Sequence, residues 1–389
     1  MSRWFDPSAS GLYIHVPFCT SLCGYCDFYR IESPGGVPEG YVDLLLREVN
    51  GYGESPRVPV DTVFFGGGTP SLLGPGDLLK LLDGLREVFE IRAGAEVTLE
   101  ANPETVSREG LAAWREAGIT RLSMGVQSLS RPILAALERH AGPEVARSAL
   151  ALACDAGFEH LSADLMSGVP GQCRQDMERT LEGLADLPLD HLSVYSLDLH
   201  PKTRLWDAVV KGELVLPGDE EAADMYLWIH ESLVGAGYEH YEVSNFARPG
   251  GRCRHNLRYW MGGETIGFGP SAWSRFRGRL WGNPRSLDGW AEAVRKGESA
   301  HEAGERLTEK RQREDRVIFG LRVSDGVEEG DIYGLLEEDG RLVDAAMRPL
   351  FDHGYVISEG GLIKLTTLGF LMSSEILTYL LPGNWPREK

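Results

Sequence analysis

The sequence predicts an α/β protein: a partial, TIM-like (βα)6 barrel followed by a small C-terminal domain of helices and a winged-helix-like hairpin. Two observations predict this class. Short apolar segments alternate with amphipathic helical segments over the first half of the chain, as in parallel sheets with right-handed crossovers. Past about Gly304 this alternation stops. We therefore expect a barrel domain at residues 1–300 and a C-terminal domain at residues 305–389.

Six apolar segments have the length and composition of buried strands. They span residues 12–16, 62–65, 96–100, 121–125, 160–165 and 191–197. Helical periodicity is clear between them, for example where Leu78, Leu81 and Leu85 recur on one face. The expected helices are residues 77–89, 108–117, 143–156 and 176–185.

The C-terminal domain is expected to contain helices at residues 306–322, 342–353 and 367–380. A hairpin at residues 355–365 is expected to turn at Gly360 and Gly361. This order resembles a winged-helix module, which ordinarily suggests DNA. However, residues 301–389 hold 17 acidic and 11 basic side chains and no basic stripe for phosphates. A protein-docking or lid role is therefore the expectation.

Charge and targeting signals narrow the class of protein further. The 389-residue chain has a formal net charge of −19, which argues against nucleic acid as the principal partner. Residues 1–10 lack the features of a signal peptide, and no stretch of about 18 apolar residues occurs. We expect a cytoplasmic protein without a transmembrane segment, with association at a membrane surface left open. A reducing compartment would also keep its cysteines available as thiolates.

One short loop holds Cys19, Cys23 and Cys26, directly after the first expected strand. Three thiolates at this spacing can bind one cubane 4Fe-4S cluster and leave one iron without a protein thiolate. A zinc site would need a fourth ligand nearby, and a disulfide framework would need an even cysteine count with secretory signals. The remaining cysteines have no partner at useful spacing and are expected to be buried or incidental: Cys154, Cys173 and Cys253.

Other unusual residues also follow expected strands at their carboxyl ends, which is where barrels of this type build active sites. The glycines at residues 66–68 would let a ligand approach the backbone closely. Asp164 and Gln127 could hydrogen-bond ribose hydroxyls. Arg139 could pair with a carboxylate through its planar guanidinium.

The cysteine spacing, with Tyr25 before the third cysteine, resembles the radical S-adenosylmethionine (SAM) superfamily. The resemblance implies a radical SAM barrel with a 4Fe-4S cluster whose open iron is chelated by SAM, and an electron donor that reduces the cluster. The SAM contacts it implies are Tyr13, Gly68, Thr69, Pro70, Glu100, Gln127, Arg139 and Asp164. The cluster ligands it implies are Cys19, Cys23 and Cys26.

Further strings, among them GGGTPS at Gly66 and GVQS at Gly125, look like the coproporphyrinogen oxidase-like branch of that superfamily. Two features favour the haem chaperone family, HemW, over the oxygen-independent coproporphyrinogen III oxidase. The oxidase has a fourth cysteine where this chain has Phe28. The oxidase also has a long segment ahead of its first strand, whereas in this chain Tyr13 already lies in the first expected strand. The oxidase and a radical SAM C-methyltransferase stay as alternatives, and productive cleavage of SAM is not decided.

The segments YEVSNFA at residues 241–247 and HNLRYW at residues 255–260 are similar to signatures of the chaperone family. The second signature implies contacts with haem by His255, Tyr259 and Trp260, with haem as cargo and apo-haemoproteins as recipients. Without the resemblance, the favoured interpretation is a histidine and aromatic residues packed at the barrel edge. One departure is Trp273, which stands where relatives commonly have His.

Overall fold

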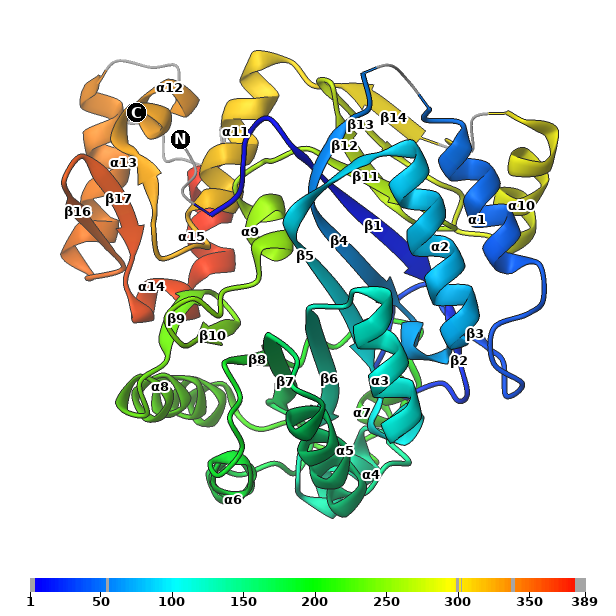
Figure 1. The fold of residues 1–389 in the computed structure, drawn as a ribbon. Coiled ribbons are helices and arrows are strands. Elements are labelled where there is room, and N and C mark those ends of the chain that lie inside the picture. The colour runs from blue at the N-terminus through cyan, green and yellow to red at the C-terminus, as the bar shows by residue number, and fades with distance from the viewer. Residues whose placement is uncertain (1–3, 54–55, 299–300, 302, 337–339, 382–389) are drawn as a thin grey trace.

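One twisted sheet organises the molecule, and it surrounds a concave inner face (Figure 1). The computed structural model describes residues 4–53, 56–298, 301, 303–336 and 340–381. Over these residues, twelve strands pair in the order β14-β13-β12-β11-β1-β4-β5-β6-β7-β8-β10-β9. The sheet does not close on itself, so the expected partial barrel is confirmed.

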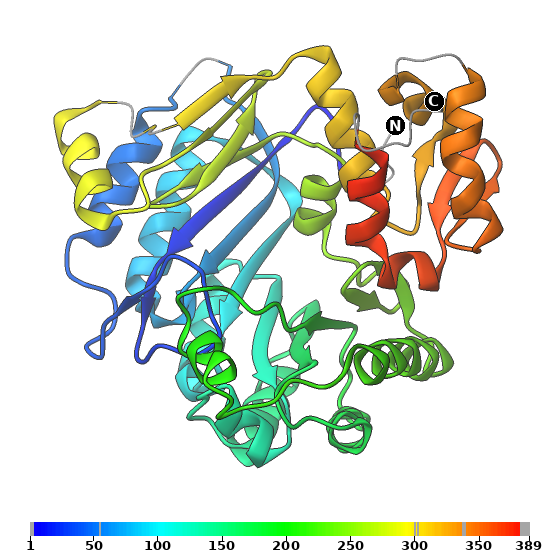
Figure 2. The same ribbon diagram turned by 180° about the vertical axis from the view of Figure 1, so that it is seen from behind.

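All six expected strands are present as the parallel centre of the sheet, each within a few residues of its expected bounds. They are β1 Ser10–Val16, β4 Pro59–Gly67, β5 Glu90–Ala101, β6 Arg121–Gln127, β7 His160–Ser167 and β8 His191–Ser196. The helices that connect them cover the outer face (Figures 1 and 2). The expected ones are α2 Pro75–Val88, α3 Arg108–Ala117, α5 Pro143–Ala156 and α6 Arg174–Leu184.

Further helices lie in the same outer layer or along the rim of the sheet. They are α1 Tyr41–Asn50, α4 Arg131–Ala136, α7 Arg204–Val210, α8 Asp219–Gly235, α9 Arg254–Trp260 and α10 Leu287–Lys296, with short 3-10 turns at Pro70–Leu72 and Pro103–Thr105. The main core lies between the sheet and this outer layer, where Leu12, Val63 and Leu99 are fully buried.

Both edges of the sheet are extended by short strands that the sequence pattern did not predict. They are β9 Glu239–Glu242, β10 Asn245–Ala247, β11 Thr265–Phe268, β12 Trp273–Phe276, β13 Arg279–Gly282 and β14 Ala303–Arg306. The pair β2 Phe18–Cys19 and β3 Ile31–Glu32 also closes the base of the cysteine loop. Segments of two to four residues are too short to show a strand period.

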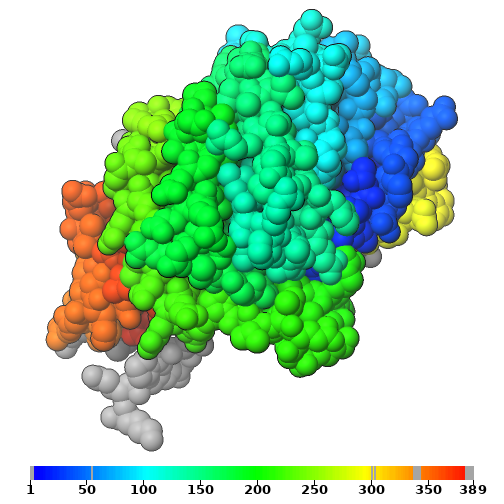
Figure 3. All heavy atoms as spheres, turned by 90° about the horizontal axis from the view of Figure 1, so that it is seen from below, coloured from blue at the N-terminus to red at the C-terminus, as the bar shows by residue number. Residues whose placement is uncertain are grey.

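The C-terminal module, the segments from α11 onward, has a hydrophobic core of its own, which includes Val317, Val343 and Leu377. Its elements are α11 Glu309–Gly320, β15 Val327–Glu328, α12 Glu329–Leu336, α13 Gly340–Asp352, β16 Val356–Glu359, β17 Leu362–Leu365, α14 Thr367–Leu371 and α15 Ser373–Leu380. Figure 3 shows it as a lobe at one side of the molecule.

The expected hairpin is confirmed, with Gly360 and Gly361 at φ of 61° and 81° as a tight hairpin turn requires. Two expectations for the helices were inaccurate. Residue 306 ends β14, and the first helix begins only after Thr308, whose side chain accepts a hydrogen bond from the Arg311 amide. The last helix is interrupted at Met372. Among the described residues, no helix is long and apolar enough to cross a bilayer.

Strand register decides which side chains face the inside of the barrel. Tyr13, Phe64, Thr98 and Arg121 are successive partners across β1, β4, β5 and β6. Side chains alternate between the two faces of a strand, so register partners share a face. This row therefore lines the concave face of the sheet, and the helices pack against its outer face.

Candidate functional site

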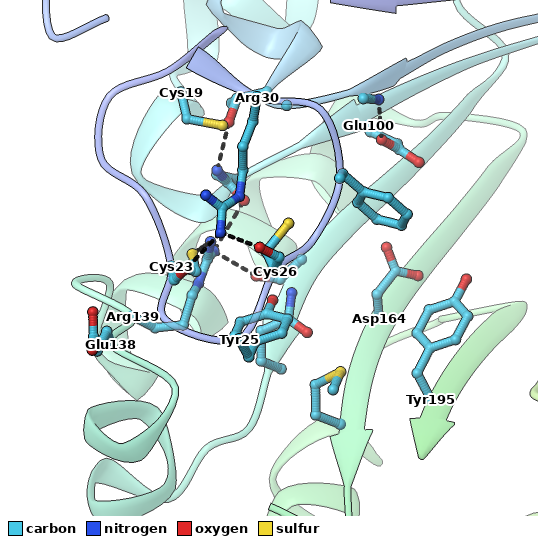
Figure 4. Close-up of a pocket in the computed structure, with 18 of the residues that line it drawn as sticks. Cys19, Cys23, Tyr25, Cys26, Arg30, Glu100, Glu138, Arg139, Asp164 and Tyr195 are labelled. Carbon is cyan, nitrogen blue, oxygen red and sulfur yellow. Dashed lines mark hydrogen bonds between the residues drawn. The ribbon is translucent and has the colours of Figure 1, made fainter. Parts of the chain in front are cut away.

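A cavity of about 380 Å³ opens at the carboxyl ends of the parallel strands (Figure 4). We call it the rim cavity. It is lined by every residue expected at the cluster and SAM sites except Tyr13. These residues come from the cysteine loop after β1, from the segments after β4 and α4, and from the last two residues of β5 and β6, as the strand-end argument predicts. Asp164 differs, because β7 continues for three residues beyond it.

The cysteine loop is held in place by contacts to its backbone. The Arg30 guanidinium donates to the carbonyl oxygens of Cys23, at 2.8 Å, and Cys26. The Leu205 amide, at the start of α7, donates to the Gly24 carbonyl at 3.0 Å. Figure 2 shows the cysteine loop and the α7 segment side by side. The loop backbone is therefore fixed by charged and amide donors while the thiols stay free for another partner.

The three thiols are unpaired and differ in their surroundings. Burial raises the pKa of Cys19, partly offset by a hydrogen bond with Thr69. The Cys23 sulfur accepts a hydrogen bond from Nη1 of Arg139 at 3.5 Å.

The donor set fits a cluster better than a single ion. No three His, Cys, Asp or Glu side chains in the described part of the chain are grouped closely enough to bind one metal ion. Ligands of an iron-sulfur cluster bind different irons and therefore lie farther apart than ligands of one ion. The three thiols line one cavity together with Arg30 and Arg139, so a cluster bound there would meet all three.

The glycines after β4 have a structural reason that the sequence did not reveal. A Cβ atom on Gly68 would lie 2.6 Å from the Pro17 carbonyl carbon, and one on Gly67 would lie 2.7 Å from the His15 ring. What approaches these glycines is the base of the cysteine loop. The Gly67 amide also donates to Oε2 of Glu100 at 3.2 Å. The glycine segment therefore packs the cysteine loop against the end of β5.

Arg139 is positioned by neighbours on its Nη2 side. Nη2 donates to Oδ1 of Asn102 and to the Gly125 carbonyl, both at 3.0 Å. Asn102 in turn donates to Oγ1 of Thr69 at 3.0 Å. Asn102 was not expected as a site residue, although its place at the end of β5 is a signal that could have found it. Gln127 has a positive φ of 65°, which marks the end of β6 as an unusual turn.

Two carboxyl groups stand at the sheet side of the rim cavity. Burial, with Asp164 nearby, raises the pKa of Glu100 to about 8. Burial also raises the pKa of Asp164, although Ser193 and Ser123 donate hydrogen bonds to it at 2.7 Å and 2.9 Å. A bound cation would relieve the cost of ionising this pair.

Below the rim cavity lies a second cavity of about 180 Å³, the inner chamber. Its walls are Tyr13, Phe64, Thr98, Glu100, Arg121, Ser123, Ser162, Asp164, His191, Ser193, Tyr195, Cys253, His255, Asn256 and Tyr259. Tyr13 therefore shares this chamber with Glu100 and Asp164 but does not line the rim cavity. Its hydroxyl lies 3.0 Å from Nδ1 of His15.

His255 is buried at this chamber, and both of its ring nitrogens have neighbours. Nδ1 lies 2.9 Å from Oγ1 of Thr62, and Nε2 lies 3.4 Å from the Tyr259 hydroxyl. The ring stacks on Phe64 with 5.1 Å between centroids. Burial lowers the pKa of His255 to about 3, so the imidazole is neutral. Tyr259 thus joins His255, as expected, but neither nitrogen of His255 is free as it stands.

The third expected haem residue lies elsewhere. Trp260 packs against Phe319 of α11, with 6.3 Å between centroids, and under the Arg322 guanidinium. It therefore contacts the C-terminal module. Trp273 is 52% exposed on β12, where its ring covers Gly282 of β13.

Comparison with known proteins shows what the chain is similar to. Residues 13–184 match the radical SAM superfamily. The heme chaperone HemW of Mycobacterium tuberculosis is 42% identical over 288 residues, which is 73% of this chain and 74% of that protein. The heme chaperone HemW of Bacillus subtilis is 32% identical over 370 residues, 94% of this chain and 97% of that protein. Among solved structures, coproporphyrinogen III oxidase (HemN) from Escherichia coli has a TM-score of 0.83 at 26% identity, covering 97% of this chain and 91% of that chain.

Proposed function

The chain belongs to the HemW family of radical SAM proteins, and on this basis we propose that it binds haem and transfers it to apo-haemoproteins, carrying a SAM-ligated 4Fe-4S cluster. The observation that supports the proposal most is the rim cavity, which gathers three free thiols and a set of polar groups suited to SAM at one edge of the barrel.

Each of these residues has a task in the proposal. Cys19, Cys23 and Cys26 hold the cluster, which supplies electrons to SAM when both are bound. Arg139, fixed by Asn102 and Gly125, offers its remaining N–H groups to the SAM carboxylate. The carboxyl groups of Glu100 and Asp164 accept the positive charge and the ribose hydroxyls of the cofactor.

Two observations support haem as the cargo: the membership of the family and an exposed apolar residue at the rim cavity. Phe28 lines the rim cavity and is 68% exposed, where the resemblance places a fourth cysteine in the oxidase. An apolar ring at this position suits the face of a porphyrin. Three cysteines kept as thiols are also in keeping with the proposed cytoplasmic location and with an electron donor there.

The alternative function is oxygen-independent oxidation of coproporphyrinogen III, which the likeness to HemN over nearly the whole chain favours. The two functions predict different results for haem uptake and for the conversion of coproporphyrinogen III. We expect the anaerobically reconstituted protein to take up haem at one equivalent, measured by the Soret band. We expect no protoporphyrinogen IX from coproporphyrinogen III with SAM and a reductant, measured by product chromatography.

Each half of this experiment can contradict the proposal. SAM-dependent protoporphyrinogen formation would assign the oxidase function to this chain. Absence of saturable haem binding would remove haem as the cargo. Apomyoglobin as a recipient measures the transfer step separately, through the appearance of its haem spectrum.

A further inference from the structure

We propose that the inner chamber binds a carboxylate arm of the cargo, with Arg121 and Thr98 as its hydrogen-bond partners. This inference rests on the proposed function, since haem is a tetrapyrrole with two propionate arms. It adds the place where one arm is held and the residues that recognise it.

Two buried polar atoms at the chamber have no partner. Arg121 and Thr98 are register partners on β6 and β5, and each is at most 1% exposed. Nη1 of Arg121 and Oγ1 of Thr98 make no hydrogen bond within the described part of the chain. Buried polar groups are nearly always paired, so two unpaired groups side by side indicate a missing acceptor.

The rest of the Arg121 side chain is fully engaged, which fixes the direction of the free N–H group. Nε donates to Oε2 of Glu96 at 3.0 Å, and Nη2 donates to the Gly251 carbonyl at 2.9 Å. Glu96 also accepts from the amides of Arg254 and His255 at the start of α9. The guanidinium is therefore held rigidly, and its free donor needs no reorganisation to bind an oxygen.

The electrostatics of the chamber are compatible with an added carboxylate. Glu96 already neutralises Arg121, so an added carboxylate gains a free N–H donor of the guanidinium but no net positive charge. Burial lowers the pKa of His191 and His255, so both imidazoles are neutral. Because the pKa of Glu100 is about 8, its carboxyl is largely protonated at neutral pH as long as no cation is bound beside it. Asp164 is satisfied by serine hydroxyls.

Size and access fit an arm that enters from the rim cavity. A volume of about 180 Å³ is the share of roughly six water molecules, enough for a three-carbon carboxylate with water beside it. Four residues line both cavities: Glu100, Ser123, Asp164 and Tyr195. A ring held at the rim could therefore extend one arm between them.

The test compares haem with its dimethyl ester, which has the same iron and ring but no charged arm. Wild-type protein should bind haem about ten-fold or more tightly than the ester, as expected for a hydrogen-bonded charged group. Thr98→Val keeps the side-chain shape and removes the hydroxyl, so this preference should fall several-fold. Thr98→Ser, the matched control, retains the hydroxyl and should keep the preference. Titration by absorption measures all six affinities.

The outcomes separate the two proposals. Equal affinity of wild-type protein for haem and ester would overturn the inner-chamber site, while haem remains the cargo. A preference for haem that Thr98→Val leaves unchanged would place the carboxylate elsewhere and also overturn it. Binding of neither compound would overturn the proposed function itself. Because the Thr98 hydroxyl makes no hydrogen bond to any described residue, its variants test the site without breaking the Arg121–Glu96 pair.

Discussion

At the scale of single residues, the six cysteines separate into two groups. Cys19, Cys23 and Cys26 line one cavity, whereas Cys154 lies on the outer helix α5. Cys173 begins α6 on the outside, and Cys253 is buried beside Glu96. Chain spacing predicts that the first three lie together, because a loop of eight residues holds its thiols close to one another wherever it lies.

Replacing a thiol of the cysteine loop should prevent cluster assembly. Cys23→Ala removes one of three ligands, and two thiolates cannot hold a cubane whose fourth iron is given to SAM. We expect loss of the SAM-responsive signal in electron paramagnetic resonance after anaerobic reconstitution. Cys154→Ala is the matched control and should reconstitute as wild type does. A SAM-perturbed signal of normal intensity in Cys23→Ala would remove this residue from the ligand set.

At the scale of elements, the glycine segment after β4 and the cysteine loop form one packed unit. Gly68 leaves no room for a side chain beside Pro17, and the Gly68 amide donates to the Val16 carbonyl at 2.8 Å. The position of the cysteines therefore depends on a segment about fifty residues away in the chain.

Adding one methyl group to this unit should disturb the loop. Gly68→Ala places a Cβ atom 2.6 Å from backbone atoms of Pro17, so the loop must shift. We expect lower iron content after reconstitution and weaker SAM binding by calorimetry. Gly76→Ala, in the first turn of α2 with open space around its Cβ, is the control and should raise stability by about 0.4 to 1 kcal/mol. Normal iron content and SAM affinity in Gly68→Ala would show that the loop tolerates the shift.

At the scale of the whole molecule, buried titratable groups set the pH dependence of stability. Burial raises the pKa of Glu48 to about 7 and that of Glu100 and Glu242 to about 8, from 4.5. Burial lowers the pKa of His15 to about 4 and that of His255 to about 3, from 6.5. The carboxyl groups and the histidines therefore change the free energy of unfolding in opposite directions as the pH rises.

Stability of the cofactor-free protein should fall between pH 6.5 and pH 8. In this window the folded carboxyls still hold protons that the unfolded chain has released. Each such carboxyl therefore lowers the free energy of unfolding by up to about 1.4 kcal/mol per pH unit as the pH rises. The histidines oppose this mainly below about pH 7, where the unfolded chain takes up protons that the folded chain excludes. Urea midpoints measure the effect, and Glu100→Gln should reduce the slope. A midpoint that rises from pH 6.5 to pH 8 would contradict this account.

The sequence by itself determined the six parallel strands, the hairpin and those cysteines and strand-end residues of the rim cavity that local motifs mark. These depend on local signals: apolar period, glycine turns and the rule that parallel strands end at one edge. Only the tertiary structure decided that Tyr13 and His255 line a separate chamber, that Trp260 contacts the C-terminal module, and that Thr98 and Arg121 meet. A strand pattern gives two faces, but register and neighbour order decide which side chains share one, and both are set by contacts between segments far apart in the chain.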